Sequence, residues 1–255
     1  MNYRTQKQII IASVSAIFLL GFVFLFTFLL GGAEPPEAQK APVSETQKPA
    51  FSDIEILFSK FFPAKDKNIF DAVAYIKNPN SEYGSPDISY EFVFYGENNI
   101  EIKKISGNAF ILPARSRYIV ETAINIEDAL GTIPKSMDFK IKDVSWQRLS
   151  PFSPKGLTLR ETELKTSPDS STFSGIATNS TPYSLKNIEA HVVIYKGGEA
   201  ISAGRTDIQD LLRGSERAFQ ILLPHYIPSG FEDDARIESN FFENSNFIRD
   251  YAVAP

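Results

Sequence analysis

Apolar and polar residues alternate along most of the chain after residue 50. One stretch places Ile88, Tyr90, Phe92 and Phe94 at every second position, with Glu91 between them. Successive side chains of a β-strand point to opposite faces of the sheet, so a period of two predicts a strand with one buried and one solvent-facing side. The many Phe, Tyr, Ile and Val residues favour strands as well. We therefore expect a mainly β protein.

The strand pattern occurs twice, with an offset of about 100 residues. The matching segments are 72–78 with 173–179, 88–96 with 188–197, 111–116 with 210–215, 118–126 with 218–223, and 137–146 with 235–242. Each copy offers about six or seven strand-like runs separated by Gly, Pro, Asn and Asp, which is typical of a small β-sandwich. We place the two domains at 51–149 and 155–245, joined by a Pro-containing hinge, and expect short helical turns at 127–131 and 208–213.

Residues 9–30 form a span without a charged residue, a Pro or an amide side chain. As a helix this span would reach roughly 33 Å, enough to cross a hydrocarbon core of about 30 Å. A cleaved signal peptide is the alternative, but its apolar region is shorter, about 7–15 residues. Arg4 and Lys7 precede the span, so we expect residues 1–8 in the cytoplasm and residues 31–255 outside it.

Two further segments flank the predicted domains. Residues 31–50 are rich in Pro, Ala and Glu and have no periodicity, which is typical of an extended spacer. Residues 246–255 form a C-terminal tail in which apolar and aromatic residues stand among polar ones. We expect this tail either to be disordered or to dock on the second domain. A short apolar-aromatic segment also suits a groove on a partner.

Short motifs within the repeat resemble those of known domains. In each copy a strand ends in Asn, a turn follows, a long strand ends in an aromatic residue, and a short step leads into the next strand. The motifs are 76–80, 94–96 and 112–116 in the first copy, and 177–179, 193–195 and 212–215 in the second. This pattern resembles the small immunoglobulin-like domains of the FxLYD and WHy (LEA14-like) group. The resemblance implies two tandem Ig-like β-sandwich domains of a bacterial envelope protein with a non-enzymatic role, and it supplies no catalytic residues.

The charge and the cysteine content exclude several classes of function. The net charge is −5, and no run of Lys or Arg is dense enough to follow a row of phosphates, so nucleic acid is not an expected partner. The chain has no Cys, which excludes disulfides, thiolate metal sites and Cys nucleophiles. The sequence contains no Gly-rich phosphate loop and no nucleophile elbow. We therefore expect no cofactor.

Neither of the two histidines is expected to take part in chemistry. His191 aligns with Glu91 in the repeat, on the face opposite Phe92, and should face solvent. His225 follows Pro224 and should lie in a loop. A ligand or catalytic role is the alternative. However, two distant histidines without Cys do not make a zinc site, and a catalytic triad cannot be recognised from scattered residues. We predict no catalytic and no metal-binding residues.

The remaining candidates also have structural explanations. Residues 232–234, and Asp66 with Asp71, lack the alternating carboxylates and the Gly of a calcium loop, so we expect solvated loops. Asn179 begins a formal glycosylation motif, but it is also the strand-ending Asn of the repeat. Core or inter-domain packing explains Trp146 more readily than ligand binding does. The sequence assigns no ligand-binding residue.

Together these features predict a membrane-anchored, extracytoplasmic, non-enzymatic protein. The helix over 9–30 would hold it in the bilayer, and two sandwiches would bind or scaffold another component of the cell envelope, either a protein or a cell-wall polymer. The alternative is a structural or assembly subunit of a larger envelope secretion or surface complex. An envelope hydrolase is a remote alternative, because carboxylate pairs for glycoside hydrolysis are defined by distance in space rather than in sequence.

Overall fold

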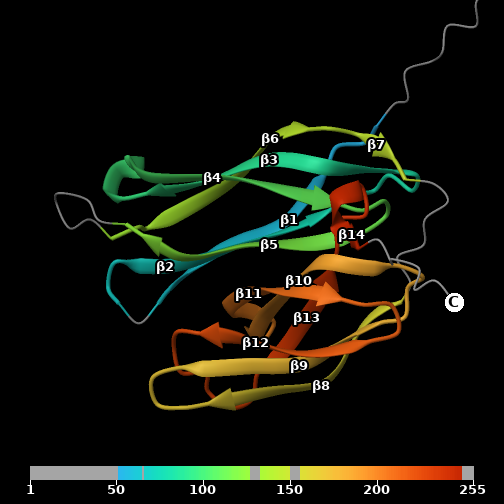
Figure 1. Cartoon of the computed structure of the whole chain (residues 1–255). Coiled ribbons are helices and arrows are strands. Elements are labelled where there is room, and N and C mark those ends of the chain that lie inside the picture. Colours follow the sequence, from blue (N-terminus) through green and yellow to red (C-terminus); the bar gives the residue numbers. More distant parts are fainter. Residues whose placement is uncertain (1–50, 65, 127–132, 150–155, 249–255) are drawn as a thin grey trace, which may run out of the picture. The chain divides into compact units, whose positions relative to one another are not determined.

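Strands make up almost all of the regular structure. The computed structural model describes residues 51–64, 66–126, 133–149 and 156–248. The strands are β1 (Glu55–Pro63), β2 (Ile69–Lys77), β3 (Tyr83–Tyr95), β4 (Glu101–Ile111), β5 (Ser116–Asn125), β6 (Ser136–Val144), β7 (Gln147–Arg148), β8 (Leu157–Thr166), β9 (Ser171–Asn179), β10 (Ser184–Lys196), β11 (Glu199–Leu211), β12 (Glu216–Leu223), β13 (Glu232–Glu238) and β14 (Phe247–Ile248). Two short 3-10 turns, η1 (Glu97–Asn99) and η2 (Asn244–Asn246), are the only helical elements in these ranges (Figure 1). The prediction of a mainly β protein is confirmed.

These strands form four antiparallel sheets. The sheets β1-β2-β5 and β4-β3-β6 make up the first sandwich, with β7 added to β3. The sheets β8-β9-β12 and β11-β10-β13 make up the second sandwich, with β14 added to β10. The order of β8 to β14 thus repeats the order of β1 to β7 (Figure 1). The internal repeat predicted from the sequence is confirmed as a repeat of topology.

The long strand β3 has the two faces that its pattern predicts. Ile88, Tyr90, Phe92 and Phe94 are all buried in one apolar cluster between the sheets of the first sandwich. Burial of each such side chain contributes about 1.5–3 kcal/mol. Glu91 points away from the cluster, and its Oε2 lies 3.5 Å from the Nζ of Lys142. The period of two therefore fixes which side chains enter the core.

The strand-ending asparagines hold equivalent turns in the two sandwiches. The Nδ2 of Asn78 donates to the carbonyl oxygens of Tyr83 and Leu112 at 2.7 and 3.1 Å. The Nδ2 of Asn179 donates to Tyr183 O and Leu211 O at 2.8 and 3.0 Å. Asn179 is fully buried, so its amide is out of reach of a glycosylating enzyme in the folded protein. The turn explains this residue, as the sequence predicts.

The two cores are filled by different residues at equivalent places. Phe92 and Phe139 are paired across β3 and β6 in the first sandwich. Val192 and Ala235 form the corresponding pair across β10 and β13 in the second. The second core takes aromatic bulk from the opposite sheet instead, for example from Phe173 of β9. The topology is therefore shared while the packing is not.

One predicted local feature differs from the structure. The helical turn expected at 208–213 is wrong, because Ile208 pairs with Ile188 and is buried, which keeps β11 extended to Leu211. Within the tail expected at 246–255, Phe247 and Ile248 pair with β10, so this part docks on the second sandwich, which is one of the two expected outcomes. The part of that tail after residue 248 lies outside the described residues. The turn expected at 127–131 lies outside the described residues.

The predicted membrane span at 9–30, the spacer at 31–50 and the hinge at 150–155 also lie outside the described residues. Within the described ranges, no helix is long and apolar enough to cross a membrane.

Candidate functional site at the junction of the two sandwiches

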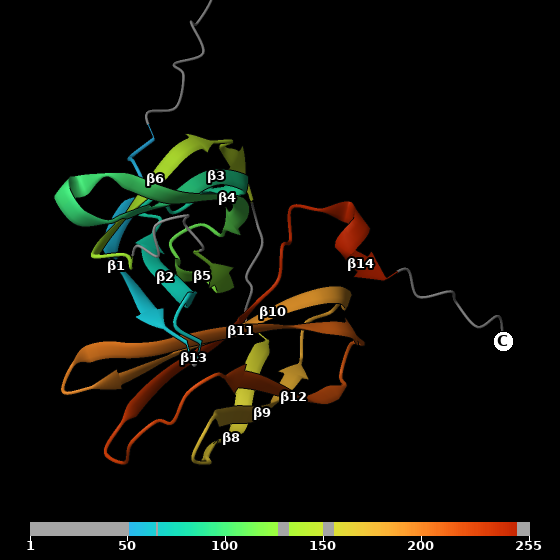
Figure 2. The same ribbon diagram turned by 90° about the vertical axis from the view of Figure 1, so that its left-hand side faces the viewer.

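The two sandwiches contact each other face to face. The outer side of β1-β2-β5 lies against the outer side of β11-β10-β13, and Figure 2 shows β10 and β11 beneath the first sandwich. At the centre, Val73, Tyr118 and Val120 meet Val193 and Ala203. Each of these five residues is at most 1% exposed. We call this contact the junction, and its centre is closed to water.

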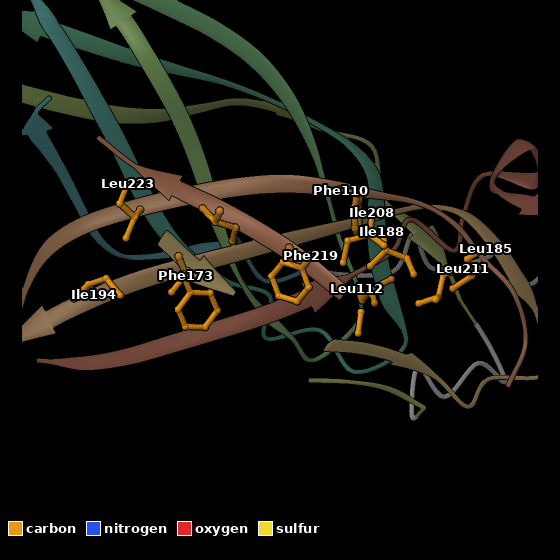
Figure 3. Close-up of a cluster of buried hydrophobic side chains, with 14 of the residues drawn as sticks. Phe110, Leu112, Phe173, Leu185, Ile188, Ile194, Ile208, Leu211, Phe219 and Leu223 are labelled. Atoms are coloured by element: carbon orange, nitrogen blue, oxygen red, sulfur yellow. The ribbon is translucent and has the colours of Figure 1, made fainter. Parts of the chain in front are cut away.

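The first sandwich also contributes to the core of the second. Phe110, near the end of β4, and Leu112, just after it, belong to the apolar cluster of the second sandwich. Figure 3 shows both side chains beside Ile188 and Ile208. The second core is therefore completed by side chains that arrive from outside its own two sheets.

A hydrogen-bonded network borders the apolar centre. The hydroxyl of Tyr118 donates to Asp234 at 2.8 Å and lies 2.9 Å from the hydroxyl of Tyr195. Arg236 donates to Asp234 at 2.7 Å and to the hydroxyl of Tyr75 at 2.8 Å. Burial alone would raise the pKa of Asp234, but the hydrogen bonds from Arg236 and Tyr118 hold that pKa below its usual value. Asp234 is therefore ionised and tied to both sandwiches.

Arg117 is a deeply buried charge of the junction. Its side chain is 3% exposed, pairs with Glu189, and lies 3.8 Å from Glu238. Its guanidinium stacks 3.9 Å from the centroid of the Phe110 ring. Burial raises the pKa of Glu238, although Arg117 opposes this shift. One arginine of the first sandwich thus compensates two carboxylates of the second.

His191 is buried, so the expectation that it faces solvent is wrong. It is 2% exposed, and its Nε2 lies 3.5 Å from Glu189 Oε2. Burial lowers the pKa of His191, and the nearby guanidiniums of Arg117 and Arg205 lower it further. Its counterpart Glu91 keeps a partly exposed position. His191 and Glu91 do occupy equivalent positions, but the first sandwich covers this face of the second sandwich.

Two of the acidic groups expected in solvated loops also lie in strands. Asp71 of β2 is 2% exposed, and its Oδ1 accepts a hydrogen bond from Ala123 N at 2.9 Å. Burial raises its pKa, while the nearby His225 opposes the shift. Residues 232–234 open β13 instead of forming a loop. Only Asp66 of this set is exposed in a turn. Asp71 is buried because the junction covers polar residues that a single sandwich would expose, whereas residues 232–234 join β13 because they pair with β10.

His225 lies just beyond β12, as expected, and its carbonyl oxygen accepts a hydrogen bond from Ser171 Oγ at 3.0 Å. Burial lowers the pKa of His225, and Asp71 of the first sandwich opposes that shift. Trp146 follows β6 and stacks on Phe51, with the ring centroids 5.2 Å apart. Trp146 therefore packs at the end of the first sandwich where β1 begins.

Two clefts open beside the junction. The first, of about 530 Å³, lies between the edge strands β8 and β13. Its main charged groups are already engaged, since Arg236 binds Asp234 and Glu238 faces Arg117. The second, of about 460 Å³, we call the amide cleft. It is lined by Pro86, Asp87, Asn108, Ala109, Phe110, Asn187, Glu189, Asn240, Glu243 and Asn246. Both sandwiches contribute to each cleft.

Hydrogen bonds hold the wall of the amide cleft in place. Asn240 Oδ1 accepts from Phe242 N at 3.1 Å, and its Nδ2 donates to Glu243 Oε1 at 3.0 Å. Asn246 is buried, its Oδ1 accepts from Asn187 N at 2.8 Å, and its Nδ2 donates to Ser239 Oγ at 2.8 Å. These contacts fix the side chains before any ligand arrives, which lowers the entropy cost of binding.

Other polar atoms of the amide cleft face solvent and have no partner in the part of the protein that the structure describes. Among the described residues, no hydrogen bond uses the side chains of Asn108 and Asp87, the Nδ2 of Asn187, or the second carboxylate oxygens of Glu189 and Glu243. These unpaired atoms include amide donors, amide acceptors and carboxylate acceptors. No Lys or Arg lines this cleft. Its free hydrogen-bonding capacity therefore points toward a polar ligand that both donates and accepts.

Sequence reasoning did not single out these residues. They come from separate strands and loops of both copies, and only the junction brings them together. No motif spacing could have revealed them. In the part of the chain that the structure describes, no group of three His, Cys, Asp or Glu residues is placed to hold a metal ion.

Comparison with known proteins gives no relative. No family profile matches the sequence, and neither does any curated protein. Among solved structures, the crystal structure of red sea bream transglutaminase aligns with 10% sequence identity and a TM-score of 0.24. The alignment covers 74% of this chain and 29% of that chain, so this chain spans under a third of its length. A TM-score this low supports no inference about shared fold or activity.

Proposed function

We propose that this chain is a membrane-anchored, extracytoplasmic, non-enzymatic protein that presents two immunoglobulin-like β-sandwiches as one binding or scaffolding unit of the cell envelope. The anchor at 9–30 and the spacer at 31–50 are the sequence features that support its location. The resemblance to FxLYD and WHy domains supports the immunoglobulin-like assignment and the envelope role.

One observation carries the proposal: residues of both sandwiches line one shared cleft beside a buried junction. Two flexibly linked domains would each present a separate surface. A closed junction instead fixes the two surfaces relative to each other, which suits recognition of one ligand by both. The titratable groups of the junction favour a structural role over catalysis, because Arg117, Asp234 and Arg236 are engaged in contacts that join the sandwiches.

The junction can be tested in intact cells by carbodiimide cross-linking. Lys60 Nζ and Glu199 Oε1 lie 2.5 Å apart across the junction, so the reagent should join them in an amide. Lys77 and Glu55 lie 3.2 Å apart within the first sandwich and provide an internal control. Lys60→Arg keeps the charge but yields no amide. Loss of the Lys60–Glu199 product while the control product persists would show that the sandwiches are not docked.

The location and the role need two further measurements on the full chain. External protease should digest residues 51–255 in whole cells, and protection there would contradict the proposed orientation. The protein purified in mild detergent should sediment with isolated cell-wall material. Copurification as a complex of fixed stoichiometry would instead favour the alternative of an assembly subunit.

A further inference from the structure

We infer that the amide cleft is a saccharide site, which takes a neutral, hydroxyl-rich ligand between the two sandwiches. This inference rests on the proposed binding function and deepens it by naming the ligand chemistry. The cleft of about 460 Å³ falls within the ~300–1,000 Å³ that small-molecule sites occupy. It sits where β3, β4 and β10 come together with the segment after β13.

The balance of donors and acceptors selects hydroxyl groups. A hydroxyl both donates and accepts hydrogen bonds, so it satisfies amide NH2 donors and carboxylate acceptors alike. An ammonium group only donates and would leave the NH2 groups of Asn108 and Asn187 without a partner. An anion would meet the carboxylates of Asp87, Glu189 and Glu243 without a lining cation. An apolar ligand would bury all of these groups unsatisfied, at high cost.

The supporting contacts also suit this ligand. Arg117 binds Glu189 from behind, so that carboxylate is held in place while its second oxygen remains available. Asn187 is held through its Oδ1, which accepts from Gln209 Nε2 at 2.8 Å and leaves Nδ2 free. Glu243 is held in the same way by Asn240. Each fixed side chain therefore keeps one defined atom for the ligand.

The test uses the full chain in detergent micelles and an array of neutral oligosaccharides built from hexoses and N-acetylhexosamines. We expect one class on the array to bind, and Asn108→Ala to weaken that binding about tenfold, because two amide hydrogen bonds are lost. Asn68→Ala is the matched control, since Asn68 is exposed and lies outside the cleft. Its affinity should equal that of the unmodified protein.

Asp87→Asn separates hydroxyl recognition from charge recognition. The amide keeps an acceptor, so saccharide affinity should change less than threefold, which is well under the tenfold step of ~1.4 kcal/mol. Spermine should not displace the saccharide. The inference would be overturned if nothing on the array bound, or if Asn108→Ala left the affinity unchanged. It would also be overturned if spermine displaced the saccharide and Asp87→Asn had a large effect on affinity. If the Lys60–Glu199 cross-link and sedimentation with cell-wall material persist in that case, the proposed function stands and only the ligand assignment fails.

Discussion

Replacing Arg117 with Met should undock the sandwiches. The side chain is 3% exposed and compensates both Glu189 and Glu238. Removing one partner of a buried ion pair costs about 3–5 kcal/mol, because the remaining charge stays buried without compensation. Met keeps most of the apolar volume against Phe110, so loss of packing adds little. A cost of this size corresponds to a shift of more than about 100-fold in the docking equilibrium.

The cost should depend on pH, with a sign that follows from the carboxylates. Burial already raises the pKa of Glu238, and the loss of Arg117 removes the group that opposes this shift. A carboxyl group whose pKa is raised in the folded protein contributes stability that is lost as the pH rises through that pKa. Arg117→Met should therefore be more destabilising at pH 8 than at pH 5.

Two readouts on the full chain in mild detergent measure this effect. The yield of the Lys60–Glu199 cross-link reports docking. Urea unfolding followed by fluorescence of the single Trp146 reports the first sandwich, where Trp146 stacks on Phe51. Arg117→Lys is the matched control, which keeps the charge but loses the planar stacking. Its stability and its cross-link yield should fall between those of the unmodified protein and those of Arg117→Met. If Arg117→Met costs under ~1 kcal/mol with unchanged cross-linking, the ion pairs do not hold the junction.

Three further predictions concern local structure. Ala114 has a φ of +51° where Gly214 of the second copy has +71°. Ala114→Gly should therefore stabilise the first sandwich by about 0.5–1 kcal/mol in urea titration, and Gly214→Ala should destabilise the second by a similar amount. Phe92→Asp should unfold the first sandwich by circular dichroism, whereas Glu91→Lys should be tolerated; an intolerant Glu91→Lys would contradict the assigned faces. The pKa of His191 is lower in the folded protein than in the unfolded chain, so on acidification the histidine is protonated in the unfolded chain before it is protonated in the folded protein. The free energy of unfolding should therefore fall as the pH drops below about 6.5. His191→Gln should flatten part of that slope, and an unchanged slope would refute the assigned burial.

The features set within one strand or one turn were predictable from the sequence. The buried face of β3 follows from alternation at Ile88, Tyr90, Phe92 and Phe94, because a local period of two has one structural solution. The turn at Asn78 recurs at Asn179 with equivalent hydrogen bonds. Such features need only near neighbours in the chain.

The junction was not predicted, because no local pattern marks the face that it covers. Residues 192–195 read Val-Val-Ile-Tyr, a continuous apolar run of the kind that strands buried on both sides give. Residues 92–95 of the first copy read Phe-Val-Phe-Tyr, an equivalent run that lies outside the junction. Alternation alone placed His191 in solvent because it assumed that one face of β10 stays free. The ligand-facing side chains of the amide cleft, such as Asn108 and Glu243, carry no comparable signal because their proximity arises only from docking.

The junction joins two different faces, and this bears on self-assembly. Contacts between unlike faces are heterologous, so they can in principle repeat head to tail into open filaments, unlike a self-complementary dimer contact. For such a filament to grow, the outer side of β8-β9-β12 would have to resemble the outer side of β1-β2-β5. Where Val73 and Val120 stand in the first copy, the second copy has Ser174 and Gln220. This exchange of apolar for polar side chains leaves the free face without the centre needed to recruit another molecule, so the pairing closes after two members.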